Sequence, residues 1–158
     1  MNTHYFEDLE PGQEFHSPGT TLTDSGIIDF GLVYDPQRFH IAREAAARSP
    51  YGGLIASGFQ TLALGFRMFF HLGIMADSSL GSPGIDELRW KAPVRPGDTI
   101  RTKVAVGEKR LSRSKPDRGT VRMAFTVVNQ RDEEVMTFTT IALVACRPAS
   151  PAAVEPGA

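Results

Sequence analysis

The chain has 158 residues, 41% of them apolar and 22% charged, which is enough for one globular domain with its own core. Its formal net charge is −1, so it lacks the basic excess expected of a nucleic-acid-binding protein. The single Cys146 excludes an internal disulfide and a cysteine-based zinc site, and together with an N-terminus that lacks a signal-peptide pattern it predicts a cytoplasmic protein.

Two helices and a short strand are predicted for the first third of the chain. The strand is expected near Glu14–His16 or near Thr20–Thr23. Thr23, Asp24 and Ser25 are candidate N-caps of a helix. This helix is expected to stop at Asp35-Pro36, because proline disfavours helical geometry in the residue before it. The segment from Asp35 to His40 is expected to be non-helical, and an alanine-rich helix follows around Ala42–Arg48.

A long apolar helix is predicted from roughly Gly58 to Met75, with Ser57 as its N-cap. The run Leu54–Ala76 is long enough to span a bilayer. It contains Arg67, however, and a charged residue in the middle of a membrane span is costly. A buried central helix is therefore the better interpretation, and no membrane partner is expected.

The second half of the chain is predicted to form an antiparallel meander. Apolar and polar residues alternate through each segment, as in strands that bury one face, and turn residues separate the segments. The predicted strands are Ile85–Lys91, Thr99–Glu108, Thr120–Asn129 and Glu134–Cys146.

These elements predict an α+β domain over residues 1–147, in which an antiparallel β-sheet is wrapped around one long central α-helix. A helix that is apolar on all sides cannot lie on a surface, and a curved sheet can enclose it. Such a sheet leaves an edge strand free, and pairing that edge across a two-fold axis covers it, so a dimer is expected. Residues 148–158 consist largely of Pro and Ala, with single Ser and Gly residues, and are expected to form a flexible tail.

Asp35 and His40 are the candidate catalytic residues. A carboxylate and an imidazole held on one short segment can share a water molecule between them, which is sufficient for general acid–base chemistry near neutral pH. The alternative is structural, with Asp35 ending a helix and His40 serving as a cap or a packed ring. The glycine-containing run Gly52–Gly58 and the later strands favour the catalytic interpretation.

Three segments of the chain resemble the motifs of MaoC-like dehydratases, hot-dog-fold proteins related to (R)-specific enoyl-CoA hydratases. The resemblance covers roughly residues 5–147. The three segments are Tyr34-Asp35-Pro36-Gln37-Arg38-Phe39-His40, Gly53-Leu54-Ile55-Ala56-Ser57-Gly58 and Leu88-Arg89-Trp90-Lys91-Ala92-Pro93-Val94-Arg95-Pro96-Gly97-Asp98-Thr99.

The resemblance implies a hot-dog fold and the reversible hydration of a 2-enoyl-CoA, which is the dehydration of a 3-hydroxyacyl-CoA. It implies no metal or redox cofactor, coenzyme A being part of the substrate, and a second copy of the chain as partner, in a homodimer or a dimer of dimers. Asp35 and His40 would hold the reacting water, and the N–H of Gly58 at the helix start would polarise the thioester carbonyl. Gly58 would let the substrate approach closely because it has no side chain. The implied substrate-binding residues are Ser57, Gln37, Phe39, Arg89 and Lys91.

The chain departs from the family pattern at three positions. Pro36 directly follows the aspartate, whereas in many members the proline follows the Asn. Gln37 stands where many members have Asn, and Ser57 stands where many have His. An acyl-CoA thioesterase on the same fold and a non-catalytic acyl-thioester-binding protein remain alternatives. The contacts to coenzyme A phosphates are also open between two basic sets: Lys109, Arg110, Arg113, Lys115 and Arg118, or Arg89, Lys91 and Arg95.

Overall fold

The computed structural model describes residues 3–148, so the predicted flexible tail lies outside the described residues apart from Pro148. The described chain forms six strands, four α-helices and one 3₁₀ turn. The strands are β1 (Glu14–His16), β2 (Thr20–Thr21), β3 (Ile85–Trp90), β4 (Thr99–Leu111), β5 (Arg118–Val128) and β6 (Glu134–Ala145). The helices are η1 (Phe6–Asp8), α1 (Asp24–Tyr34), α2 (Arg38–Ile41), α3 (Arg43–Ala47) and α4 (Gly58–Phe70).

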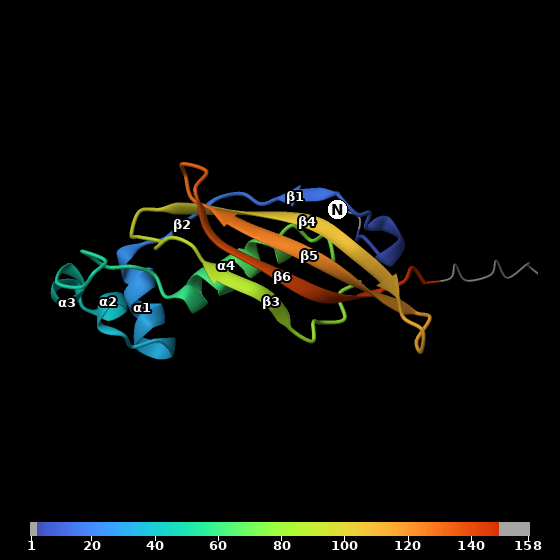
Figure 1. Cartoon of the computed structure of the whole chain (residues 1–158), viewed down its shortest axis with the longest axis horizontal. Coiled ribbons are helices and arrows are strands. Elements are labelled where there is room, and N and C mark those ends of the chain that lie inside the picture. Colours follow the sequence, from blue (N-terminus) through green and yellow to red (C-terminus); the bar gives the residue numbers. More distant parts are fainter. Residues whose placement is uncertain (1–2, 149–158) are drawn as a thin grey trace, which may run out of the picture.

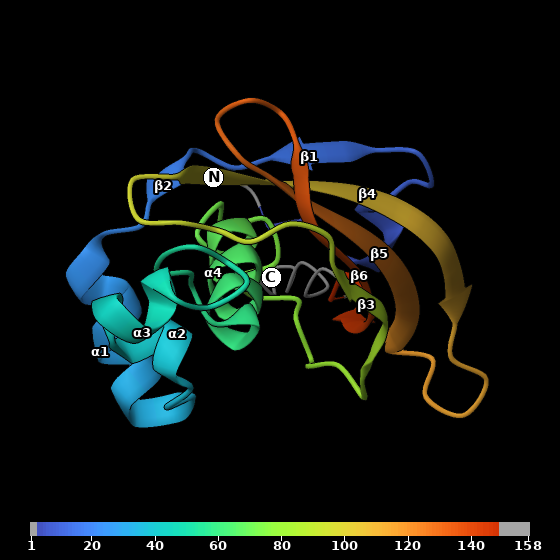
Figure 2. The ribbon, with the colours of Figure 1, turned by 60° about the vertical axis from the view of Figure 1, so that its left-hand side comes forward.

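The sheet is antiparallel throughout, with strand order β1-β4-β5-β6-β3, and β2 pairs with the start of β4. It curves around α4, as Figures 1 and 2 show. Along β4 the exposure of side chains alternates, and the apolar positions predicted to form one face are buried. Both the α+β class and the sheet wrapped around a central helix are therefore confirmed.

The core lies between α4 and the concave face of the sheet. Met68 and Phe69 of α4 are buried there, and the rings of Phe125 and Phe138 stack with centroids 4.4 Å apart. The Thr102 hydroxyl donates a hydrogen bond of 2.9 Å to the Gly65 carbonyl, which ties the middle of α4 to β4. The buried hydrophobic residues and this polar bond fix the position of α4 against the sheet.

The structure differs from the predictions in three respects. The central helix ends at Phe70 instead of Met75, because the chain turns at Gly73, which has a φ of +70° that favours glycine. The helix also has an exposed face in the single chain, where Phe59 is 58% exposed. Between Asp35 and the alanine-rich helix the chain forms the single turn α2, so the prediction of a non-helical segment is wrong.

The helices α1, α2 and α3 gather at one end of the molecule, beside the N-terminus of α4 (Figures 1 and 2). Strand β3 forms one edge of the sheet. Within residues 3–148 no helix is both long enough and apolar enough to cross a membrane. The end of the molecule at which α1, α2 and α4 meet brings the candidate catalytic residues together.

Candidate active site

Asp35 is the residue at which α1 ends. The Thr23 hydroxyl caps the start of this helix by accepting a hydrogen bond from the Gly26 N–H. At the other end, the Asp35 N–H still donates to the Gly31 carbonyl, but the non-helical conformation of Asp35 and the following Pro36 stop the helix. The Asp35 side chain is therefore held on the last turn of a well-capped helix, with 12% of it exposed.

His40 lies on α2, and only 4% of its side chain is exposed. Its Nδ1 is 2.7 Å from the Ile55 carbonyl oxygen. Because a carbonyl can only accept, Nδ1 carries a hydrogen and donates it, and Nε2 is the nitrogen left for chemistry. The turn packs closely on α1 at Gly31, where a Cβ atom would lie 3.1 Å from the Cβ of His40.

Asp35 and His40 are in direct contact. The distance from His40 Nε2 to Asp35 Oδ2 is 3.2 Å. The sequence interpretation placed a water molecule between the two side chains, and the structure corrects this, because a gap of that length has no room for one. A water molecule that contacts both groups must approach from the side of the adjacent cavity.

Hydrogen bonds favour the ionised form of Asp35. Oδ2 accepts a bond of 2.7 Å from the Ser57 hydroxyl, and Oδ1 accepts one of 2.9 Å from the Gln37 amide. Burial by itself raises the pKa of the Asp35 carboxyl, but these two bonds and the charge of the neighbouring His40 outweigh it, so the pKa lies below its usual value. Asp35 is thus held as a carboxylate and can accept a proton.

The N-terminus of α4 faces the same site. The Ser57 hydroxyl accepts a hydrogen bond from the Phe59 N–H while donating to Asp35, so one side chain caps the helix and orients the carboxylate. The Gly58 N–H has no hydrogen-bond acceptor among residues 3–148. It is therefore free to donate to a bound group, at a helix end that favours negative charge.

A cavity of about 440 Å³ lies beside these residues. This volume falls within the range of pockets that bind small organic ligands. Asp35, His40 and Gly58 all reach its wall. The other lining residues are Gln37, Phe39, Tyr51, Ile55, Ala56, Phe59, Thr61, Trp90, Lys91, Ala92, Pro93 and Val94.

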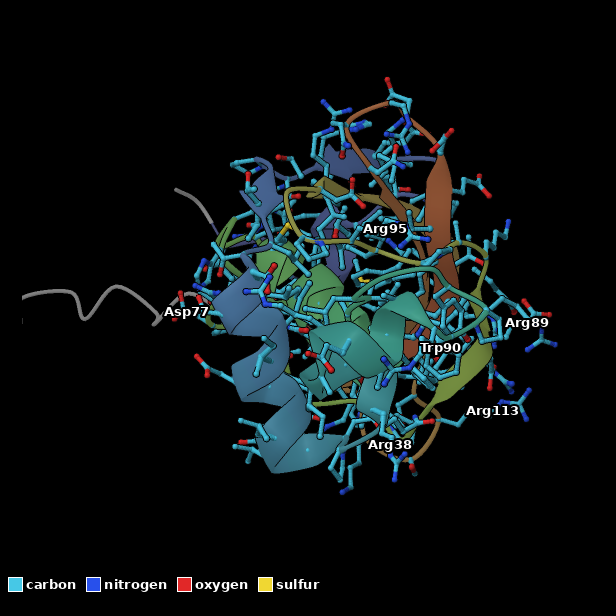
Figure 3. All side chains as sticks on the ribbon, turned by 90° about the vertical axis from the view of Figure 1, so that its left-hand side faces the viewer. Arg38, Asp77, Arg89, Trp90, Arg95 and Arg113 are labelled. Carbon is cyan, nitrogen blue, oxygen red and sulfur yellow. The ribbon has the colours of Figure 1, made fainter. Side chains whose placement is uncertain are left out.

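Only some of the predicted substrate-binding residues line the cavity. Gln37, Phe39 and Lys91 line the cavity, although the Lys91 ammonium is paired with Glu134. Ser57 is fully buried and acts on Asp35 and the helix instead of lining the cavity. Arg89 does not reach the wall either, and Figure 3 shows its side chain pointing outward from β3.

The two candidate phosphate-binding sets are partly engaged within the protein. The guanidinium of Arg95 donates to the Tyr51 carbonyl, and Arg118 is paired with Asp117. Lys109 contacts the Leu9 carbonyl and Glu10. Neither set is brought to the cavity as a whole, so the position of coenzyme A phosphates stays a prediction.

Sequence reasoning missed two contacts of the site. The Ile55 carbonyl that fixes His40 is a backbone group, and no residue type marks it. Trp90 donates from Nε1 to the Gly58 carbonyl at 2.9 Å, and it belongs to a segment that was recognised as a motif without a role for this residue. Its being the only Trp in the chain was the available signal.

Comparisons with known proteins show the family and the fold of the chain. The family model described as "MaoC like domain" matches residues 7–129. The chain is 32% identical over 127 residues to a 3-hydroxybutyryl-CoA dehydratase of Methylorubrum extorquens, covering 77% of this chain and 73% of that protein.

Two solved structures show the fold. The crystal structure of a MaoC-like dehydratase from Rhodospirillum rubrum has a TM-score of 0.84 at 35% identity, covering 92% of this chain and 99% of that one. A Mycobacterium tuberculosis protein with a double hot-dog fold has a TM-score of 0.80 at 22% identity, covering 99% of this chain and 48% of that one. The family match and the agreement of the folds together show that this chain belongs to the MaoC-like dehydratase family and has its hot-dog fold.

Proposed function

We propose that this protein is a hydro-lyase that adds water reversibly to the double bond of a 2-enoyl-CoA, giving a 3-hydroxyacyl-CoA. The supporting observation is the Asp35–His40 contact at the wall of the cavity, beside the unpaired Gly58 N–H. A relative bears the name 3-hydroxybutyryl-CoA dehydratase, which supports the same class of reaction. Acyl-CoA thioesters are the proposed substrates.

In the proposed reaction, water approaches C3 of the enoyl group from the cavity. The Asp35 carboxylate accepts one proton of the water as its oxygen bonds to C3. Negative charge then grows on the thioester oxygen, where the Gly58 N–H can stabilise it by about 3 kcal/mol. The protonated His40 delivers the Nε2 hydrogen to C2, which completes the addition of water.

The direct contact between Asp35 and His40 would let the two side chains recover their starting protonation states after each turnover. After hydration, Asp35 carries a proton and His40 has lost one. A proton can pass back from Asp35 Oδ2 to His40 Nε2 across the 3.2 Å contact, restoring the starting state. The His40 Nδ1–H remains bonded to Ile55 throughout, so the ring keeps its orientation.

A panel of 2-enoyl-CoA substrates tests this function. Loss of the enoyl absorbance without release of free thiol is the expected result for at least one short, branched or aromatic member of the panel. Thiol release from saturated acyl-CoA would instead assign the thioesterase reaction. Binding of acyl-CoA with no turnover of any member would identify a non-catalytic acyl-binding protein and contradict the proposal.

Replacing Ser57 with Ala should move the acidic limb of the pH–rate profile to higher pH. Asp35 must be ionised to accept a proton, so the rate falls as the pH drops through the pKa of this carboxyl. The Ser57 hydrogen bond contributes to the lowered pKa, so its loss raises that pKa. The cap of α4 is lost as well, which should cost about 1 kcal/mol of stability.

Thr23→Ala is the matched control for this experiment. It removes the N-cap of α1, which has the same chemistry but makes no contact with Asp35. It should lower Tm by a similar amount and leave the acidic limb unmoved. If S57A and T23A give the same pH–rate profile, the proposed control of the Asp35 pKa by Ser57 is wrong.

We further propose that two copies of the chain pair along β3. This strand is a sheet edge, and it carries Ile85 and Trp90, which are 42% and 50% exposed. Phe59 on the neighbouring helix is exposed too. Association would cover the free edge and these apolar side chains. Size-exclusion chromatography with light scattering should give a mass twice that of the chain for the wild type. The Ile85→Lys variant should have the mass of a single chain. A monomeric wild type would contradict the proposal.

A further inference from the structure

Trp90 and Gly58 are in close contact at the cavity wall. The indole Nε1–H donates to the Gly58 carbonyl at 2.9 Å. A Cβ atom on Gly58 would lie 2.5 Å from Cε2 and 2.6 Å from Nε1 of Trp90, which is closer than such contacts occur. The space above Gly58 is thus occupied by the indole, and the expectation that it is kept open for the substrate needs revision.

The indole is held by a second contact as well. Its ring meets that of Phe59 edge to face, with centroids 6.0 Å apart and planes at 75°. The indole therefore contacts the first two residues of α4, whose unpaired Gly58 N–H is the proposed donor to the thioester oxygen.

We propose that Trp90 is a positioning residue that fixes the first turn of α4, and that Trp90, not the substrate, requires glycine at position 58. The part that concerns catalysis rests on the proposed function. Glycine has the greatest backbone freedom of any residue, so an amide donor on glycine keeps one direction only if something restrains it. The hydrogen bond from Trp90 restrains the carbonyl of Gly58. The indole also occupies the space next to the Gly58 Cα, which limits the movement of this residue.

Fluorescence tests the contact without any need for turnover. Trp90 is the only Trp in the chain, so emission reports on this site alone. Gly58→Ala should displace the indole, shift the emission to longer wavelength and increase quenching by acrylamide. Gly84→Ala is the matched control, because a Cβ atom there meets nothing within 4 Å and its φ is an ordinary one. Unchanged emission in G58A would overturn the proposed fit.

Kinetics test the positioning role. G58A and W90A each break the same interaction, so each should lower kcat, by about 10-fold, and the double variant should be no worse than either alone within about threefold. KM and the pH–rate profile should change little, because the interaction acts on the transition state and does not touch Asp35 or His40. W90F keeps a ring but not the N–H and should lose about 2- to 10-fold in kcat.

Each contrary outcome points to a distinct failure. Losses that multiply in the double variant, or a G58A protein that is inactive in both backgrounds, would mean that the substrate itself needs the bare glycine. A wild-type kcat in W90F and W90A would exclude positioning by Trp90. If the wild type turns over no enoyl-CoA, the proposed function fails, while the fluorescence comparison of G58A with G84A still decides whether Trp90 dictates the glycine.

Discussion

Replacing Asp35 with Asn should lower kcat/KM for enoyl-CoA hydration by about 10²–10⁴-fold, the range that general acid–base groups contribute. The side chain keeps its shape, but an amide cannot accept the proton of the attacking water. The substitution also removes the negative charge of the carboxylate, which Ser57, Gln37 and His40 stabilise. Absorbance assays at saturating substrate concentration give kcat, and assays at substrate concentrations well below KM give kcat/KM.

Asp29→Asn is the matched control for the Asp35 variant. Asp29 lies on the same helix, α1, and is exposed, so the substitution makes the same chemical change away from the cavity. It should leave kcat/KM within about twofold of the wild type, since exposed substitutions of this kind have small effects. Hydration at the wild-type rate by a correctly folded D35N protein would remove Asp35 from the mechanism.

His40→Asn should lower kcat for hydration by about 10²–10⁴-fold, because it removes the proposed proton donor to C2. The amide nitrogen of Asn can occupy the place of Nδ1 and still donate to the Ile55 carbonyl, so the turn α2 keeps its anchor. Nothing replaces Nε2, which is the atom in contact with Asp35. The variant therefore separates the chemistry of His40 from its packing.

Two measurements accompany the His40 variant. Its Tm and circular dichroism spectrum establish that it is folded, and His71→Asn, at an exposed position after α4, controls for the loss of an imidazole. H71N should retain the wild-type kcat. A folded H40N protein with unimpaired kcat would show that proton delivery to C2 does not depend on this ring.

The sequence predicted the main elements because their signals are local. Proline after Asp35 ends α1, and alternation of apolar residues marks β4 and the strands after it. Thr23 and Ser57 are N-caps, as their positions before the helices indicated. The wrapping of the sheet around α4 followed from the need to bury a helix with so few polar residues.

The details of the site depend on contacts between residues far apart in the chain. The turn α2 is short, with little intrinsic stability, and its packing on Gly31 and the bond from His40 to Ile55 hold it. The distance between the two candidate catalytic side chains depends on how that turn packs on α1. The contact between Trp90 and Gly58 joins residues that are 32 positions apart in the chain, so no local pattern predicts it.

Hydration in oxygen-18-labelled water tests the central claim most directly. Mass spectrometry of the products should find one labelled oxygen on C3 of the acyl group of an intact 3-hydroxyacyl-CoA, formed by the wild type and not by D35N or H40N. Label in the carboxylate of a free acid, or label on C3 at the same rate in all three proteins, would contradict a hydratase that works through Asp35 and His40.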